Sequence, residues 1–145
     1  MKIKRIGELI WMFIWEIIQT LLGCVVLIFL TDKKNEGLYK GRRVIRFKKG
    51  KFFSGTSLGY WILIPDNAKD KTRAHEWGHC MQSRDSGFFY LPIFGIPSLI
   101  NNLNGRKIYK YMTYEEIQKD YYNRYPEKDA DKRAGITWVD GERVL

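Results

Sequence analysis

Two histidines and the glutamate between them are the residues with the clearest capacity for chemistry. The chain contains only two histidines, and they flank Glu76 in the run His75-Glu76-Trp77-Gly78-His79. On a helix this spacing puts both imidazoles on one face, one turn apart, so both can bind the same metal ion. Zinc accepts neutral imidazole nitrogen readily and lowers the pKa of a bound water to about 7. We therefore predict one Zn²⁺ per chain, with His75 and His79 as ligands and Glu76 as the base that takes a proton from the zinc-bound water.

A third ligand should be a carboxylate, because no histidine remains and catalytic zinc usually has three protein ligands. The segment Glu127-x-x-x-Asp131 offers two acids one helical turn apart, and Pro126 can begin a helix directly before them. Three other residues of this segment are small, which allows a close approach to the histidine helix: Ala130, Ala134 and Gly135. We predict that Glu127 binds the metal and that Asp131 orients one of the histidines through a hydrogen bond.

Two alternatives for the third ligand remain open. Glu116 and Asp120 have the same spacing, but Thr113-x-x-Glu116 is a capping box, which gives Glu116 a structural role. Asp131 is the other alternative as a direct ligand. A closed structural zinc site is disfavoured because such sites are rich in cysteine, and Cys80 points about 100° away from His79 around a helix.

The paired motifs resemble those of the gluzincin metallopeptidases, the thermolysin-like clan. More closely, the runs SLGYWILI, HEWGHCMQS, YLPIFGIPSLI and EKDADKRAG are similar to a group of small bacterial membrane-associated proteins, over about residues 57–135. The resemblance implies that His75, His79 and Glu127 are zinc ligands, that Glu76 is the base, and that Asp131 supports a ligand histidine.

The resemblance also implies how a substrate would bind. The strand at residues 58–64 corresponds to an edge strand that pairs with an extended peptide, which makes Leu58, Gly59 and Tyr60 candidate substrate-binding residues. The larger gluzincins carry a Tyr or His that stabilises the oxyanion on a separate helical domain, and this chain is too short for that domain. Four tyrosines near the third ligand could donate the hydrogen bond instead, with surface or core roles as the alternative: Tyr114, Tyr121, Tyr122 and Tyr125.

The elements expected to position these residues give an α+β fold, a minimal zincin-like domain. Residues 42–53 read as a hairpin that turns at Gly50, and residues 57–64 read as a further strand. A sheet of about three strands would pack on a helix at residues 69–83, capped by Asp66, Asn67 or Asp70 and ended by Gly87. Helices from Thr113 to about Tyr125 and from Pro126 to Gly135 follow, and the tail should be a short strand or loop.

The first 31 residues predict a transmembrane helix. Residues 9–30 contain a single charge, Glu16, and are long enough to cross a bilayer. Glu8, Glu16, Gln19 and Gly23 fall near one helical face, so a buried amphipathic helix packed on the domain is the alternative. The domain would then occupy residues 32–145. Within it the apolar segment 88–100 either dips into the membrane interface or forms a buried, kinked connection.

Charge indicates the surroundings of the domain. The net charge is +9, and basic residues gather between Lys33 and Lys51, directly after the apolar run. This position favours an anionic lipid surface over nucleic acid, for which no recognisable binding motif is present. We therefore expect a single-pass membrane protein with a cytoplasmic catalytic domain. The two cysteines do not indicate a disulfide framework.

These features together predict a membrane-associated zinc metallopeptidase that hydrolyses a peptide or protein substrate near the membrane. The alternative is a zinc-binding membrane protein without activity, acting as a partner-binding or immunity-like module. Glu76 favours catalysis, because a binding module needs no carboxylate beside the metal water. A protease with its histidine helix inside the bilayer is disfavoured by the charges at residues 69–73 and 84–85.

Overall fold

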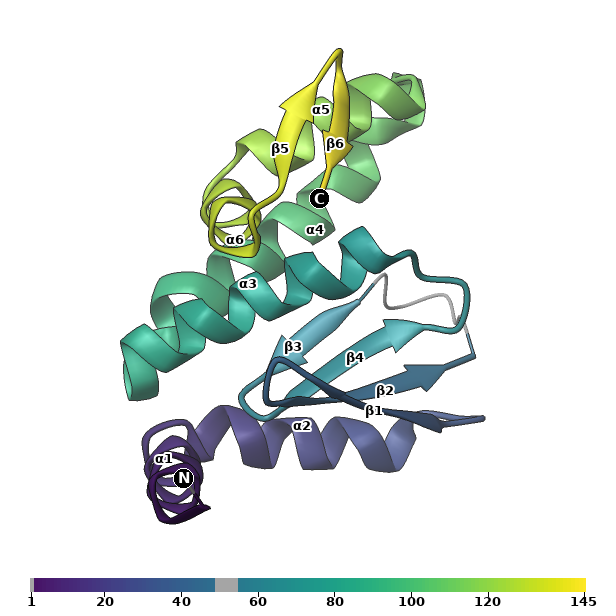
Figure 1. Ribbon diagram of the computed structural model, residues 1–145. Helices are drawn as coiled ribbons and strands as arrows, with labels where there is room; N and C mark the ends of the chain where they lie inside the picture. Colours follow the sequence, from purple (N-terminus) through teal and green to yellow (C-terminus); the bar gives the residue numbers. More distant parts are fainter. Residues whose placement is uncertain (1, 49–54) are drawn as a thin grey trace.

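The computed structural model describes residues 2–48 and 55–145, and it combines α-helices with a small mixed sheet (Figure 1). The helices are α1 (Lys2–Trp15), α2 (Ile17–Phe29), α3 (Asp70–Ser86), α4 (Ile96–Ile108), α5 (Tyr114–Asn123) and α6 (Glu127–Ala134), with short 3₁₀ turns η1 (Gly87–Phe89) and η3 (Tyr109–Tyr111) and a π turn η2 (Leu91–Gly95). The strands are β1 (Lys34–Tyr39), β2 (Arg42–Phe47), β3 (Thr56–Leu58), β4 (Trp61–Pro65), β5 (Thr137–Val139) and β6 (Glu142–Val144). The expected mixture of helices and sheet is confirmed.

The main sheet has four strands in the order β1-β2-β4-β3, one more than expected. β2 pairs with β1 in antiparallel and with β4 in parallel orientation. The turn between β1 and β2 is made by Lys40 and Gly41, which both have positive φ, as tight hairpins require. The hairpin predicted to turn at Gly50 falls partly on residues 49–54, which lie outside the described part. The antiparallel partner of β2 is β1. Strand β1 was not predicted, because its sequence, KNEGLY, is mostly polar.

The prediction of one strand over residues 57–64 is wrong. The chain turns back at Gly59 and Tyr60, so that β3 and β4 form an antiparallel hairpin. Gly59 has a φ of 58°, and a Cβ atom there would lie 2.1 Å from the Thr20 hydroxyl oxygen, so glycine is required by both the backbone and the close contact. As a result β4 is an inner strand, and β3 is an edge strand, with β1 at the other edge.

Helices cover both faces of the sheet, α2 on one side and α3 on the other (Figure 1). Val44, Ile62 and Ile64 pack with Cys80 of α3, while on the opposite face Ile45, Phe47 and Leu63 pack with side chains of α2. Alternating residues of each strand therefore face two different helices. Helices α2 and α3 therefore each cover one face of the same sheet.

The expected single helix over residues 9–30 is instead two helices, α1 and α2, bent by 83° at Glu16. Glu16 is fully buried and forms an ion pair with Arg42 at 2.8 Å. A buried charge must be paired, and this partner lies in the sheet rather than along a straight helix. Among the described residues no single helix is long and apolar enough to cross a membrane, whereas the bent pair meets the length and composition requirement.

Helix α3 begins after Lys69, which lacks a side-chain cap, so none of the three predicted capping residues is the N-cap. Its end at Gly87 is confirmed, with a φ of 52° that suits glycine. The capping box of Thr113 and Glu116 is confirmed at the start of α5. Helix α6 follows Pro126 and ends at Gly135 in a left-handed cap, and the tail forms the hairpin β5–β6.

Candidate metal site

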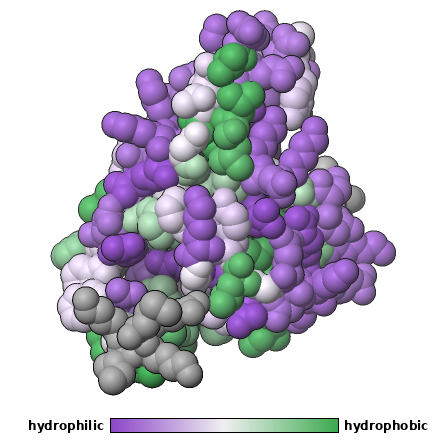
Figure 2. Space-filling view, viewed as in Figure 1, coloured by the Kyte–Doolittle hydropathy of each residue, from purple (hydrophilic) through white to green (hydrophobic). Residues whose placement is uncertain are grey.

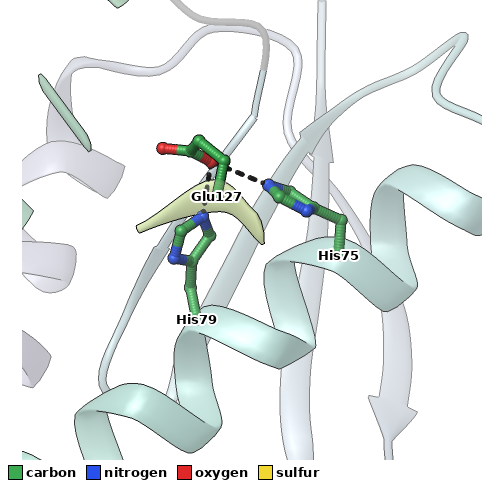
Figure 3. Close-up of side chains that lie close together, drawn as sticks. All are labelled: His75, His79 and Glu127. Carbon is green, nitrogen blue, oxygen red and sulfur yellow. Dashed lines mark hydrogen bonds and ion pairs between the residues drawn. The ribbon is translucent and has the colours of Figure 1, made fainter. Parts of the chain in front are cut away.

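The three predicted ligands come together between helices α3 and α6 (Figure 3). The Nε2 atoms of His75 and His79 lie 3.1 and 3.0 Å from the same oxygen, Oε2 of Glu127. All three residues are buried, and their ligand atoms lie within 4.8 Å of one another. Two imidazole nitrogens and one carboxylate oxygen are the donor set of an open zinc site. This group could hold a metal ion.

Close packing of α3 on α6 makes the convergence possible. A Cβ atom on Gly78 would lie 2.0 Å from the backbone oxygen of Ala130, so only glycine allows this approach. Ala130 is fully buried and Ala134 nearly so, which agrees with the predicted role of small residues in α6. Gly78 thus has a structural reason of its own within the HEWGH run.

Each ligand is held by a further hydrogen bond on its far side. The Nδ1–H group of His75 donates to Asp131 at 2.6 Å, as predicted, and that of His79 donates to Oε1 of Gln82 at 2.7 Å. The hydroxyl of Ser98 donates to Oε1 of Glu127 at 2.5 Å. With a metal bound, these bonds would fix the tautomer in which both Nε2 atoms present a lone pair to the centre of the site.

A second tier of contacts extends from Asp131. Arg143 of β6 is buried and donates two hydrogen bonds to the Asp131 carboxylate, at 2.8 and 2.5 Å. Its guanidinium group lies over the ring of Tyr122, 3.1 Å from the centroid. The Tyr122 ring in turn contacts His75, with 5.1 Å between centroids. The C-terminal hairpin therefore reaches the metal site through Asp131.

Sequence reasoning missed Gln82, Ser98 and Arg143. Gln82 had a local signal, because a residue three positions after His79 lies on the same helix face. Gln82 also donates to the Pro126 carbonyl at 3.0 Å, which ties α3 to the start of α6. Ser98 and Arg143 come from distant segments and had no such signal.

The charges of the buried groups favour a cation at the centre of the site. Burial opposes the protonation of His75, but hydrogen bonds to Asp131 and Glu127 and the charge of Glu76 raise the pKa of His75 to about 9. Burial also opposes ionisation of Glu127, yet the two histidines hold the pKa of its carboxyl far below the usual range. A metal ion would supply the positive charge that the protonated imidazole supplies without it.

Glu76 is buried beside the ligands, next to the start of the edge strand β3. Burial raises the pKa of Glu76, and the nearby His79 and His75 partly offset that rise. Gly55, directly before β3, lies against it: a Cβ atom there would be 2.8 Å from Oε1 of Glu76. A raised pKa is what a general base needs for working near neutral pH.

The predicted substrate-binding residues fall on different elements from those expected. Leu58 ends the edge strand β3, but Gly59 and Tyr60 form the turn after it. The Tyr60 N–H donates to the hydroxyl of Thr20 in α2 at 3.2 Å, and the Gly59 carbonyl accepts a hydrogen bond from Arg42 at 2.8 Å. The strand beside Glu76 is therefore Thr56–Leu58, and a role in peptide binding stays a prediction for that strand.

The other candidates separate clearly. Glu116 accepts from Thr113 in its capping box, and Asp120 pairs with Arg124 at 2.7 Å, so the alternative acid pair is engaged elsewhere. Of the four candidate tyrosines, Tyr122 has its ring against His75. The Tyr125 hydroxyl donates to the Ile93 carbonyl at 2.8 Å, and Tyr114 is largely exposed.

Comparison with protein-family models, with curated proteins and with solved structures finds no match to this chain. Function must therefore be argued from the site itself.

Proposed function

We propose that this chain is a zinc-dependent metallopeptidase of the gluzincin type that acts on peptide or protein segments near a membrane. The observation that carries the proposal is the convergence of His75, His79 and Glu127, each with its far side held by a further hydrogen bond. A site with three protein ligands and an acid beside them is typical of a zinc site that catalyses hydrolysis rather than of a purely structural zinc site.

Zinc held by these three residues would act as a Lewis acid, polarising the peptide carbonyl and lowering the pKa of water. Glu76 takes the proton from the attacking water and hands it to the leaving amine nitrogen. Its burial and raised pKa suit both directions of this transfer. The edge strand β3 lies beside Glu76 and would hold an extended peptide there by adding it to the sheet.

The location at a membrane is supported by composition and by the exposed apolar surface of the first two helices. Large apolar side chains are exposed along α1 and α2, and Lys33 and Lys34 come shortly after α2. The cations after the apolar run support placing the domain on the cytoplasmic side.

The alternative is a zinc-binding membrane protein that recognises a partner without cleaving it. No oxyanion donor is assigned among the described residues, which is the observation that favours this reading. Tyr122 is the candidate for this donor, because its ring already contacts His75, a proposed ligand. A catalytic role of Tyr122 would count against the binding-only alternative.

The first experiment measures metal content by plasma mass spectrometry on the purified protein and on His79→Ala and Glu127→Ala variants. We expect about one zinc per chain in the native protein and loss of it in both variants. A native protein that binds no zinc after loose metal is removed would refute the proposal.

The second experiment separates a peptidase from a binder. A peptide library is incubated with the native protein and with Glu76→Gln, which keeps the ligands but removes the base. We expect cleavage to fall by roughly 10²- to 10⁴-fold while zinc content is unchanged. A binder would show no cleavage in either protein and would keep its partner affinity in the variant.

A further inference from the structure

Many large apolar side chains are exposed along α1 and α2, and a protein in water rarely leaves such side chains gathered and uncovered. The contacts of α1 with the rest of the chain lie at its end, where Phe13 meets Tyr60 and Trp15 meets Phe88. Apart from the half-buried Met12, the remaining side chains of its apolar stretch are exposed. We define the anchor face by six residues that are each about half exposed or more: Ile10, Trp11 and Ile14 of α1, and Leu21, Val25 and Ile28 of α2. Figure 2 shows the side of the strands and α3 as mostly hydrophilic, with small hydrophobic patches at the lower edge and a longer hydrophobic stripe in the upper part.

The opposite side of α2 is part of the domain core. A Cβ atom on Gly23 would lie 2.5 Å from the Trp61 ring, and Val26 and Leu27 pack against the strands. The strand next to them, β2, carries three arginines. If α2 crossed a bilayer, these strands would be carried to hydrocarbon depth with their charges and backbone groups. At 13 residues α2 is also only about 20 Å long, against roughly 30 Å of hydrocarbon.

The bend between the two helices is fixed by polar contacts to the domain. Glu16 pairs with Arg42 in a fully buried position. Gln19 donates to the Ser83 hydroxyl at 3.1 Å and to the Gly87 carbonyl at 2.8 Å, and the Trp15 indole N–H donates to the Arg84 carbonyl at 3.0 Å. Straightening α1 and α2 into one span would break the buried ion pair and these hydrogen bonds.

We propose that α1 and α2 form an in-plane anchor: the anchor face lies in the interface of an anionic bilayer, and the sheet faces water. This rests on the membrane association proposed above, but not on peptidase activity. Three features fit lipid as the occupant. From Leu9 to Trp15 α1 is apolar around its circumference, the exposed Trp11 has an amphipathic ring of the kind found at headgroup level, and cations open α1 and follow α2. The same charges would oppose a second copy of the chain at this face.

Cysteine accessibility tests the orientation. Lys4→Cys at the start of α1 and Lys34→Cys at the start of β1 are placed singly in a Cys24→Ser background and labelled with a membrane-impermeant maleimide. Spheroplasts and inverted vesicles from the expression host are compared. An in-plane anchor exposes both positions on the same side of the membrane, so both cysteines label in the same preparation. Labelling of the two positions in opposite preparations would show a transmembrane span and overturn the proposal.

Vesicle flotation tests the occupant. The native protein should float with phosphatidylcholine/phosphatidylglycerol vesicles, and the double variant Ile10→Glu/Ile14→Glu should bind at least about tenfold more weakly. Val139→Glu is the matched control, because it is the same kind of change at an exposed apolar residue of β5. Absence of flotation together with a dimer in sedimentation would assign the face to a second copy. Zinc content, measured in parallel, should be unchanged in these variants, which separates this result from any failure of the metal site.

Discussion

At the scale of single residues, the site is defined by what stands behind each ligand. His75 is held by Asp131, His79 by Gln82 and Glu127 by Ser98, so each ligand atom is aimed before any metal arrives. Preorganisation of this kind keeps the histidine tautomers fixed and raises the affinity for metal. The supporting residues are therefore as informative to mutate as the ligands.

Asp131→Asn should weaken zinc binding by roughly 10- to 100-fold, because the amide loses the negative charge that holds the Nδ1 proton of His75. The measurement is competition with a chromophoric zinc chelator. Asp120→Asn is the control, since Asp120 has the same place in the alternative acid pair and contacts Arg124 instead. Equal losses in both variants would contradict the proposed ligand set.

Gly55→Ala should reduce catalysis without removing zinc. The new methyl group would press on the Glu76 carboxylate, and displacing a catalytic group by about 1 Å costs on the order of a hundredfold. Peptide cleavage and zinc content are measured on the same sample. Gly37→Ala supplies the control: its φ of 113° brings similar backbone strain, but a Cβ atom there meets nothing within 4 Å. If both variants lose activity alike, strain rather than contact with Glu76 is the cause.

At the scale of elements, two close contacts hold the site in place. One is the crossing of α3 and α6 at Gly78 and Ala130, which brings Glu127 to the histidines. The other is the bend between α1 and α2, where Glu16 reaches across to Arg42 of β2. Both contacts join segments that are far apart in sequence. The first requires glycine at position 78, and the second requires a carboxylate at position 16.

Gly78→Ala should push α6 away from α3, because its methyl group would meet the Ala130 carbonyl. We expect a loss of about 1–3 kcal/mol in the free energy of unfolding and a loss of zinc affinity. Chemical denaturation and zinc titration measure the two effects. Gly7→Ala in α1 is the control for the propensity of alanine itself, since its surroundings are open. Unchanged zinc affinity in Gly78→Ala would mean that α6 tolerates displacement.

Glu16→Gln should destabilise the protein by about 3–5 kcal/mol, because Arg42 would be left buried without its counter-charge. The double variant Glu16→Gln/Arg42→Met should lose less than the sum of the two single variants. Denaturation in mild detergent gives all three values. The half-buried surface pair Asp120–Arg124, treated in the same way, should show a coupling below about 1 kcal/mol. Additive losses at Glu16 and Arg42 would show that the buried pair does not hold the bend.

At the scale of the whole molecule, metal binding and pH both change the free energy of unfolding through the charge at His75. In the zinc-free protein the pKa of His75 is raised to about 9 from 6.5, so its contribution to stability is fully present below about pH 6.5 and is lost as the pH rises through 9. Zinc takes the place of that proton, so the loss of stability as the pH rises toward 9 should disappear in the zinc-loaded protein.

The melting temperature of the chelator-treated protein should therefore fall between pH 6.5 and 9.5, while that of the zinc-loaded protein stays nearly level. The difference between the two curves at each pH isolates the metal site from other titrating groups. A zinc-free protein whose melting temperature is level over this range would contradict the proposed charge arrangement around His75.

The sequence alone determined the local features. The spacing of His75 and His79 placed them on one helix face, the capping box at Thr113 fixed the start of α5, and the small residues of α6 indicated a close helix contact. These depend on neighbours three or four positions apart, which sequence displays directly.

Tertiary structure decided what depends on distant partners. The apolar run at residues 9–30 predicted one helix because it is long and contains a single charge, whereas polar contacts of Trp15, Glu16 and Gln19 with the domain bend it. The expected strand at residues 57–64 is a hairpin that turns at Gly59, where Thr20 of α2 packs too closely for any side chain. Arg143 and Ser98 joined the metal site from segments that no local pattern connects to it. A buried polar group takes its partner from wherever the fold brings one, and that choice is not visible along the chain.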